Sequence, residues 1–403
     1  MSTMSYIPRP KAGFVKIAGL TIIAISILFV LTSTYSLNSL PPPKYSIPGN
    51  SLNTGDEVSS DVSSDIPNDV SNDVSNDVSN SHSSIPNLVH YVHIMPDGPD
   101  EDIKFGLKHF LSVYSTKFYF NPDTIYLHTD ASYASIERAR DSPLATAPNK
   151  WANLILNLPS VVVNRVSPPE KASGSGVTIK GLEHKSDFVR AEVVYEHGGM
   201  YVDFDVYALR DVKPLREAGF ANVLGRQKKG QVNSGCWMSQ KGSTLMKMWV
   251  EGQHEVYDGR WTTHSNDLLT SLADRNSNGG LLTSIGEYLK PGEKEVGNDI
   301  LILDEKAFAP TSWEVKDATA LFEGHPESVG NSTTRDHTPE WEVSYSSSYV
   351  LHAFKASGFH KIPYFDPEGI TMPYLLAQHS NFARAIYPSV KHAMDAGIIS
   401  ADD

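Results

Sequence analysis

The segment SDFVRAEVVYEHGGMYVDFDVY, residues 186–207, carries the clearest structural pattern in the chain. Its first half, residues 187–197, places apolar and aromatic side chains at the spacing of a helix packed on one side. Gly198 and Gly199 follow, and glycines commonly end helices. Residues 200–207 are rich in strand formers. The segment therefore predicts a helix, a glycine break and a short buried strand.

Two aspartates, Asp203 and Asp205, interrupt this apolar strand. Carboxylates are seldom buried without a partner. Because residues i and i+2 of a strand point to the same face, the two carboxylates can share one cation. Carboxylate oxygens suit Mn²⁺ or Mg²⁺ better than softer metals. The alternative interpretation is an edge strand with one solvated face.

The flanking residues resemble the signature of the DxD-containing glycosyltransferases of family 32, which include fungal α-1,6-mannosyltransferases. In that signature a helix with S-D-x-x-R precedes G-G-x-Y-x-D-x-D. The matching residues are Ser186, Asp187, Arg190, Gly198, Gly199, Tyr201, Asp203 and Asp205. The resemblance implies a Rossmann-like GT-A fold and metal-dependent transfer from a nucleotide sugar, with retention of anomeric configuration.

The resemblance also implies roles for these residues. Asp205 is the expected direct ligand of Mn²⁺ or Mg²⁺, and Asp203 reaches the cation through water or hydrogen-bonds the ribose. Asp187 and Arg190 would hold the ribose and a phosphate or sugar hydroxyl of the donor. The alternative for Asp187 and Arg190 is a surface ion pair at i,i+3, which is worth only about 0.2–0.5 kcal/mol. No residue is assigned as a catalytic nucleophile.

Three positions outside the segment match the family more weakly. His93 stands at the end of the opening strand, where the family usually has a tryptophan near the nucleobase. Asn233 stands where an asparagine often faces the donor sugar. His352 occupies the position of a late histidine near the metal and diphosphate, which makes it a candidate third metal ligand; a core histidine is the alternative. The histidine pairs elsewhere lack the cysteines or HExxH context of a zinc site.

Strand-like and helical stretches alternate from residue 85 onward. Strands are expected at 88–94, 124–129, 153–157, 161–164 and 221–225, with further strand material at 231–240 and helices near 103–115 and 242–256. This alternation indicates an α/β domain on a largely parallel sheet. Ligands bind such sheets at the carboxyl ends of strands, where the aspartates lie.

The N-terminus predicts a membrane anchor. Residues 17–37 contain no charge and no proline, and about 20 such residues cross a bilayer. Arg9, Lys11 and Lys16 precede the span, which places residues 1–16 in the cytoplasm and the remainder in the lumen. A cleaved signal peptide is the alternative. We expect a single-pass type II protein of the Golgi or ER membrane.

Residues 38–84 predict a disordered acidic stem. They are rich in Ser, Asn and Asp and include three NDVS tetrads at 68–79; such a composition cannot offset the entropy of ordering. The lumenal catalytic domain is expected to span residues 85–403. Asn331 begins an N-S-T sequon, a candidate lumenal glycosylation site.

Composition narrows the functional classes. A net charge of −13 argues against a nucleic-acid partner, and a lone cysteine, Cys236, excludes an intrachain disulfide. The predicted function is transfer of a hexose, from GDP-mannose first and a UDP-hexose such as UDP-galactose second, to a glycan or glycolipid acceptor. The alternative is a non-catalytic lumenal lectin that binds carbohydrate through Ca²⁺. A glycoside hydrolase is disfavoured because acids at i and i+2 are too close to flank a sugar ring.

Overall fold

The computed structural model describes residues 84–141, 149–277, 299–326, 339–354, 362–365 and 369–403. Among these residues, seven strands form the central sheet in the order β3-β2-β1-β4-β7-β6-β8. Their bounds are Val161–Arg165, Thr124–Thr129, Leu88–His93, Gly199–Val202, Cys236–Ser239, Asn222–Gly225 and Ile300–Leu303, respectively. The pairs β1·β2, β2·β3, β1·β4 and β6·β8 are parallel, whereas β7 runs antiparallel to β4 and β6. The predicted α/β domain with a largely parallel sheet is confirmed.

The sheet is buried on both faces, as the first strand illustrates. Along β1, Val89 and Tyr91 belong to one apolar cluster, whereas Val92 belongs to a second. Successive side chains of a strand point to opposite faces, so a strand covered on both sides has an almost continuous apolar run. This is why residues 88–94 contain hydrophobic residues at both odd and even positions.

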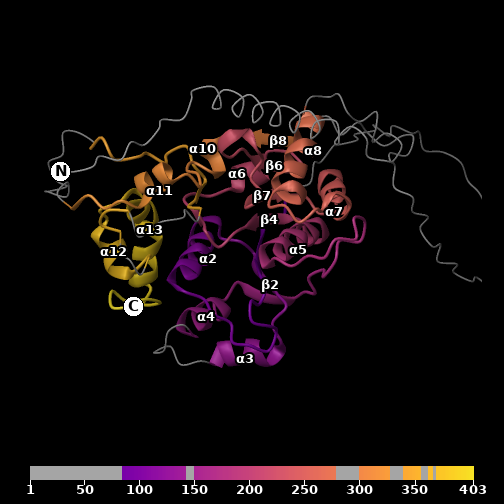
Figure 1. Cartoon of the computed structure of the whole chain (residues 1–403). Helices are drawn as coiled ribbons and strands as arrows, with labels where there is room; N and C mark the ends of the chain where they lie inside the picture. The colour runs from indigo at the N-terminus through magenta and orange to yellow at the C-terminus, as the bar shows by residue number, and fades with distance from the viewer. Residues whose placement is uncertain (1–83, 142–148, 278–298, 327–338, 355–361, 366–368) are drawn as a thin grey trace, which may run out of the picture. The chain divides into compact units, whose positions relative to one another are not determined.

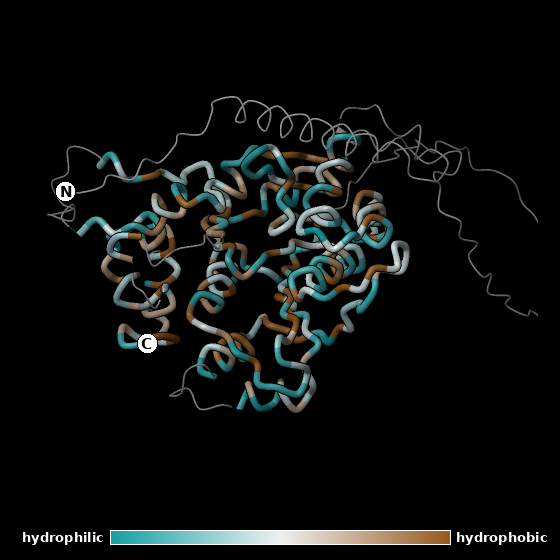
Figure 2. The backbone as a smooth tube through the Cα atoms, in the orientation of Figure 1, coloured by the Kyte–Doolittle hydropathy of each residue, from teal (hydrophilic) through white to brown (hydrophobic). Residues whose placement is uncertain are grey.

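Helices cover the two faces. The first cluster includes side chains of α2 (Leu107–Phe120), α4 (Asn149–Leu156) and α13 (Asn381–Asp395). The second includes side chains of α5 (Leu182–His197), α7 (Thr244–Val256) and α8 (Leu268–Ser277). Figure 1 shows α5, α7 and α8 together on the side of the strands opposite α2 and α13. Figure 2 shows hydrophobic and hydrophilic residues interleaved along the described chain, as expected of amphipathic elements around shared cores.

Shorter elements complete the fold. A two-stranded antiparallel sheet pairs β5 (Val206–Ala208) with β9 (Val350–His352). The remaining helices are α3 (Tyr133–Asp141), α6 (Lys213–Arg216), η1 (Lys228–Gly230), η2 (Thr263–Asp267), α10 (Glu305–Phe308), α11 (Val315–Phe322) and α12 (Met372–Ala377). Because β9 lies late in the chain and β5 directly follows the two aspartates, this pairing brings His352 to the aspartates.

Two sequence predictions are wrong. Residues 153–157 were expected to form a strand, but they belong largely to helix α4. Trp151, Ala152, Ile155 and Leu156 are all buried, which is the i, i+4 spacing of a helix face. In addition, residues 200–207 do not form one strand, because β4 ends at Val202 and β5 begins at Val206. Asp203 and Asp205 therefore lie in the turn between two strands.

The predicted cytoplasmic tail, membrane anchor and stem cover residues 1–84, and all of these except Ser84 lie outside the described residues. No helix within the described ranges is long and apolar enough to cross a membrane. The described residues all belong to one compact unit, Val78–Asp403. The predicted segment boundaries remain predictions.

Candidate functional site

The glycine break positions the aspartate turn. Helix α5 ends at His197; its C-cap, Gly198, has a φ of 68°, and Gly199 follows with a φ of 109°. Both values are left-handed and favour glycine. A Cβ at Gly199 would lie 2.6 Å from the carbonyl oxygen of Leu88 in β1. The two glycines thus let the chain turn sharply from α5 into β4, against β1.

Asp203, Asp205 and His352 form a cluster with the chemistry of a cation site. One ligand atom from each lies within 4.8 Å of the others. The side chains of Asp203 and Asp205 are 29% and 42% exposed, so solvent reaches the carboxylates. Gly235 lies beside them, and a Cβ there would be 2.7 Å from both Asp203 Oδ2 and His352 Cε1. The residues present therefore fit a hard divalent cation, because they leave open a cradle that a side chain would fill.

Asp203 is held by two neighbours. Its Oδ1 accepts a hydrogen bond from the Tyr201 hydroxyl, and its Oδ2 lies 3.4 Å from Nη1 of Arg190. Burial raises the pKa of Asp203, Arg190 opposes this shift, and the charge of Asp205 adds to it. Two carboxylates this close repel each other unless a proton or a cation is shared. A bound cation would remove that conflict.

Asp205 has a different environment. Its Oδ1 lies 3.4 Å from Nε2 of His352, and its carbonyl oxygen accepts a hydrogen bond from the Ala353 amide. Burial acts to raise the pKa of Asp205, but His352 outweighs this and holds the pKa below its usual value. Asp205 is therefore the carboxylate of the pair that stays ionised most readily. This fits its predicted role as the direct ligand.

Arg190 and Asp187 are buried, so the surface ion-pair alternative is wrong. Each side chain is 8% exposed, and Nη2 of Arg190 contacts Oδ1 of Asp187 directly. Nη1 of Arg190 also donates to the carbonyl oxygen of Ser234 at 2.8 Å. Burial acts to lower the pKa of Arg190, but Asp187 and Asp203 outweigh it and raise that pKa. The guanidinium thus links helix α5, the aspartate turn and the residues before β7.

His264 extends this network, and nothing in the sequence motif pointed to it. Its side chain is 0% exposed, and its Nε2 lies 2.9 Å from Oδ2 of Asp187. His264 comes from the π-helical turn η2, where its ring stacks on Phe188. Each carboxylate oxygen of Asp187 therefore has a neighbour within the chain, Arg190 at Oδ1 and His264 at Oδ2.

Asn233 lies in the site but contacts other protein groups. It is 1% exposed; its Nδ2 lies 2.9 Å from Nδ1 of His352, and its Oδ1 accepts from the Gly235 amide at 2.7 Å. The structure therefore brings Asn233, His352 and both aspartates together. The predicted contact between Asn233 and the donor sugar remains a prediction.

His93 belongs to an aromatic group beside the turn. Its ring lies 4.7 Å from that of Phe105 and 6.3 Å from that of Phe204, the residue between the two aspartates. His109 of α2 packs on Phe204 as well, at 5.3 Å. Burial lowers the pKa of His93 to about 4, and its buried Nε2 has no hydrogen-bond partner among the described residues. A neutral, flat ring at the carboxyl end of β1 is consistent with the predicted place near a nucleobase, which stays a prediction.

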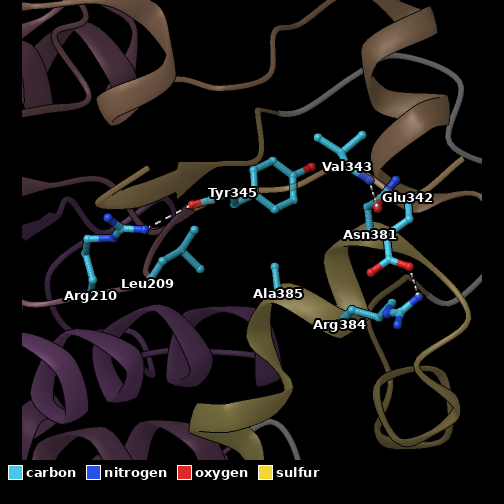
Figure 3. Close-up of a pocket in the computed structure, with 8 residues that line it drawn as sticks. All are labelled: Leu209, Arg210, Glu342, Val343, Tyr345, Asn381, Arg384 and Ala385. Carbon is cyan, nitrogen blue, oxygen red and sulfur yellow. Dashed lines mark hydrogen bonds and ion pairs between the residues drawn. The ribbon is translucent and has the colours of Figure 1, made fainter. Parts of the chain in front are cut away.

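A pocket of about 320 Å³ opens elsewhere on the domain and includes none of the predicted site residues. Figure 3 shows its polar groups directed at one another: Arg384 pairs with Glu342, Asn381 accepts from the Val343 amide, and Arg210 donates to the Tyr345 carbonyl. These partners satisfy the charged lining within the chain. We therefore place the functional site at the aspartate turn. The predicted glycosylation site Asn331 lies outside the described residues.

Comparison with known proteins supports this placement. Residues 112–228 match the family described as a glycosyltransferase sugar-binding region containing a DXD motif. This part of the chain is therefore similar to DXD-type glycosyltransferases. The matched region includes Asp187, Arg190, Asp203 and Asp205, so the predicted resemblance and the prediction of a glycosyltransferase are confirmed.

Among curated proteins, the chain is 22% identical over 302 residues to glucan organizing enzyme 1 of Cryptococcus neoformans var. grubii serotype A, covering 71% of this chain and 67% of that protein. Similar solved structures include the PaToxG glycosyltransferase, with 14% identity over 51% of this chain and 76% of that one at a TM-score of 0.34. The galactosyltransferase LgtC, solved with donor and acceptor sugar analogs, is 11% identical over 75% of this chain and 95% of its own, at a TM-score of 0.30.

Proposed function

We propose that this glycosyltransferase moves a hexose from a nucleotide-sugar donor to a glycan or glycolipid acceptor, using a divalent cation held by Asp203 and Asp205. The observation that carries the proposal is the cluster of Asp203, Asp205 and His352, whose ligand atoms lie within 4.8 Å of one another. Both aspartates lie inside residues 112–228, the region that matches the DXD family. Mn²⁺ or Mg²⁺ suits carboxylate oxygens. The overall architecture proposed is the GT-A type.

The cation would supply charge neutralisation at the diphosphate leaving group. The chain's own residues prepare the site for it. Asp205, with its pKa held low, provides a charged oxygen, and Arg190 and Tyr201 fix the orientation of Asp203. Such preorganised groups lower the barrier because they need not reorient during the reaction.

GDP-mannose is the first donor to test, because the aspartate signature resembles that of fungal α-1,6-mannosyltransferases; UDP-galactose is the second. The name of the curated relative refers to glucan, which supports a saccharide acceptor. Retention of anomeric configuration is proposed on the same resemblance. The anomeric signal of the product in a proton NMR spectrum tests it: an inverted product contradicts it.

Incubation of the purified protein with a panel of nucleotide sugars tests the proposed activity. We expect hydrolysis or transfer from one donor with Mn²⁺ or Mg²⁺, and loss of that activity in excess chelator with recovery when the cation is restored. Full activity in chelator contradicts the proposed role of the cation. The alternative, a lectin, would bind saccharide in the presence of Ca²⁺ and would bind none of the nucleotides.

We also propose that the protein is a type II Golgi or ER membrane protein with a lumenal catalytic domain. The support is the uncharged span 17–37 after Arg9, Lys11 and Lys16. Protease treatment of sealed microsomes tests the orientation: digestion of the C-terminal domain without detergent contradicts it. Loss of a glycosidase-sensitive mass shift in Asn331→Gln would add support, and release into alkaline carbonate contradicts a membrane-spanning segment.

A further inference from the structure

A partly buried tryptophan, Trp313, lies close to the aspartate turn, in the segment that follows β8 and α10. Its ring meets that of Phe354 at 5.7 Å between centroids and nearly at right angles. Phe354 in turn stacks on the ring of His352, at 3.6 Å between centroids. Nζ of Lys229 lies 5.6 Å from the centre of the Trp313 ring. One aromatic ring therefore separates Trp313 from the candidate cation site.

Polar contacts hold the chain on both sides of Trp313. The residue before it, Ser312, donates its hydroxyl proton to Oδ2 of Asp317. The residue after it, Glu314, accepts from Nζ of Lys228 at 2.8 Å, and the same Nζ donates to Asp317 at 2.9 Å. Because Lys228 belongs to η1, these contacts join η1 to the segment that carries the tryptophan. The indole is thereby positioned before a ligand binds, which reduces the entropy that binding costs.

Both residues that contact the Trp313 ring have left-handed backbone conformations. The φ of Lys229 is 69° and that of Phe354 is 46°, values that are uncommon in residues other than glycine. Asn121 and Gln378 also have positive φ, but they end helices α2 and α12, where this conformation is common. Lys229 and Phe354 end no α-helix. Strained backbone of this kind gathers at sites that hold ligands, and here it places a cation and a ring against one indole.

The order of the strands separates this group from His93. Strands β1, β4, β6 and β8 all run in one direction, so their carboxyl ends share one edge of the sheet. Lys229 follows β6 and Trp313 follows β8, whereas His93 ends β1, and β4 lies between these strands in the sheet. With the nucleobase at its predicted place near His93, the strands beyond β4 are left for the second substrate. Ligands bind such sheets at this edge.

We propose that Trp313 is the platform on which a pyranose ring of the acceptor saccharide stacks, with Lys229 donating to one of its hydroxyl groups. The proposal rests on the proposed function, because it names where the second substrate binds. The C–H groups on one face of a pyranose are apolar and weakly positive, which matches the negative face of an aromatic ring. The hydroxyl groups at the edge of the sugar need polar partners, and the exposed Lys229 supplies one.

Fluorine nuclear magnetic resonance of the full chain labelled with 5-fluorotryptophan tests the platform directly. The chain has six tryptophans, and the Trp313 signal is the one lost in Trp313→Phe. Mannotriose, maltotriose and laminaritriose are the probes, each added in the presence of Mn²⁺ and GDP or UDP. We expect at least one of them to shift the Trp313 signal and to leave the Trp261 signal in place. Trp261 is the internal control, because it is 66% exposed and packs on His184 instead.

Titration of the same saccharide into Trp313→Ala tests whether the ring supplies affinity. We expect the dissociation constant to rise at least about tenfold in Trp313→Ala and to stay within about twofold of wild type in Trp261→Ala. The affinity for GDP or UDP with Mn²⁺ should stay within about twofold of wild type in both variants, because Phe354 lies between the indole and the candidate cation site.

A Trp313 signal that none of the three saccharides shifts overturns the proposal, and so does an unchanged saccharide affinity in Trp313→Ala. An equal loss of saccharide and nucleotide affinity in Trp313→Ala also overturns it, because the indole would then support the site as a whole. Saccharide binding through Trp313 in a wild-type protein that binds no nucleotide contradicts the proposed function and leaves the platform standing. If Trp313→Ala fails to fold, as judged by its melting curve, the wild-type fluorine spectra decide the proposal.

Discussion

Nε2 of His264 lies 2.9 Å from Oδ2 of Asp187, and both side chains are buried. The other oxygen of Asp187 contacts Arg190, whose Nη1 lies 3.4 Å from Asp203. A buried line of polar groups therefore connects η2 to the aspartate turn. Buried charges require partners, and Arg190 supplies one to both Asp187 and Asp203. His264 thereby supports the site without touching the cluster of Asp203, Asp205 and His352.

Replacing His264 by Phe should test this support. Phe keeps the ring that stacks on Phe188 but removes the contact with Asp187. Loss of one partner of a buried polar group costs about 1–3 kcal/mol, and we expect a decrease of that size in the free energy of unfolding in urea. Unchanged stability in His264→Phe would mean that Arg190 alone satisfies Asp187.

Asp205→Asn should abolish turnover and leave the fold intact. The substitution removes a ligand charge while keeping the side-chain shape, so the main loss is of bound cation. Initial rates, Mn²⁺ affinity by calorimetry and the melting curve should be measured together. Glu137→Gln on α3 is the matched control, because it removes one exposed carboxylate outside the site. Normal turnover in Asp205→Asn, or simple unfolding, would assign Asp205 a structural role.

Arg190→Lys should weaken nucleotide affinity. A point charge cannot reproduce a planar guanidinium that contacts Asp187, Asp203 and the Ser234 carbonyl at once. Calorimetry with the matching nucleoside diphosphate, with and without Mn²⁺, separates two roles. A loss of nucleotide affinity both with and without Mn²⁺ indicates that Arg190 contacts the donor directly. A loss of affinity only with Mn²⁺ indicates that Arg190 acts through Asp203. Unchanged affinity in both conditions would contradict either role.

The sequence alone located the core of the site because the motif is contiguous. Gly198 and Gly199 predicted the end of α5, and the family signature singled out Asp187, Arg190, Asp203 and Asp205 within twenty residues. Asn233 and His352 required the resemblance, since 119 residues separate them and only strand pairing brings them together. His264 has no motif; its burial results from the packing of η2 on α5.

The wrong predictions have specific causes. Residues 153–157 form a short apolar run, and such a run cannot distinguish a strand from a buried helix by periodicity alone. The run 200–207 has the pattern of one strand because the residue in the middle of its turn, Phe204, is aromatic. Phe204 lies in the turn and packs on Tyr91 and Phe105. Its apolar side chain therefore reflects tertiary packing and not a strand. A turn with an apolar tip leaves little signal in sequence.

Stability should decrease as the pH falls below about 6.5, the ordinary pKa of histidine. Burial lowers the pKa of His90 to about 4, with smaller effects from the Gly198 carbonyl and His197. Burial, His90 and His197 lower the pKa of His128 to about 2. As the pH falls, these histidines therefore bind protons in the unfolded chain before they do so in the folded protein. The stability present above pH 6.5 is lost as the pH falls from about 6.5 toward the lowered pKa values of the folded protein.

The hydrogen bonds of His90 explain why protonation is resisted. Its Nε2–H donates to the Gly198 carbonyl, so its Nδ1 accepts from Nε2–H of His128, whose Nδ1 accepts from Asn164. The ring nitrogens of His90 and His128 that carry no proton both accept hydrogen bonds, so a further proton on either ring would break one of these bonds. The free energy of unfolding in urea should be measured between pH 5 and 7.5. Its slope against pH should be smaller in His90→Gln than in the wild type, by up to about 1.4 kcal/mol per pH unit for one proton. Equal slopes in the two proteins would contradict the depressed pKa of His90.

Gly235→Ala should remove cation binding while leaving most of the fold in place. The added Cβ would lie 2.7 Å from both Asp203 Oδ2 and His352 Cε1, between the groups that form the cluster. Both are too close for a Cβ contact, so one side chain must move and the geometry of the cluster must change. Gly181→Ala is the matched control, because the nearest atom to a Cβ there is 3.6 Å away and its φ is −77°. We expect Mn²⁺ affinity and turnover to fall at least tenfold in Gly235→Ala, corresponding to about 1.4 kcal/mol or more, and to remain near wild type in Gly181→Ala. Wild-type Mn²⁺ affinity in a folded Gly235→Ala protein would place the cation away from the space between Asp203 and His352.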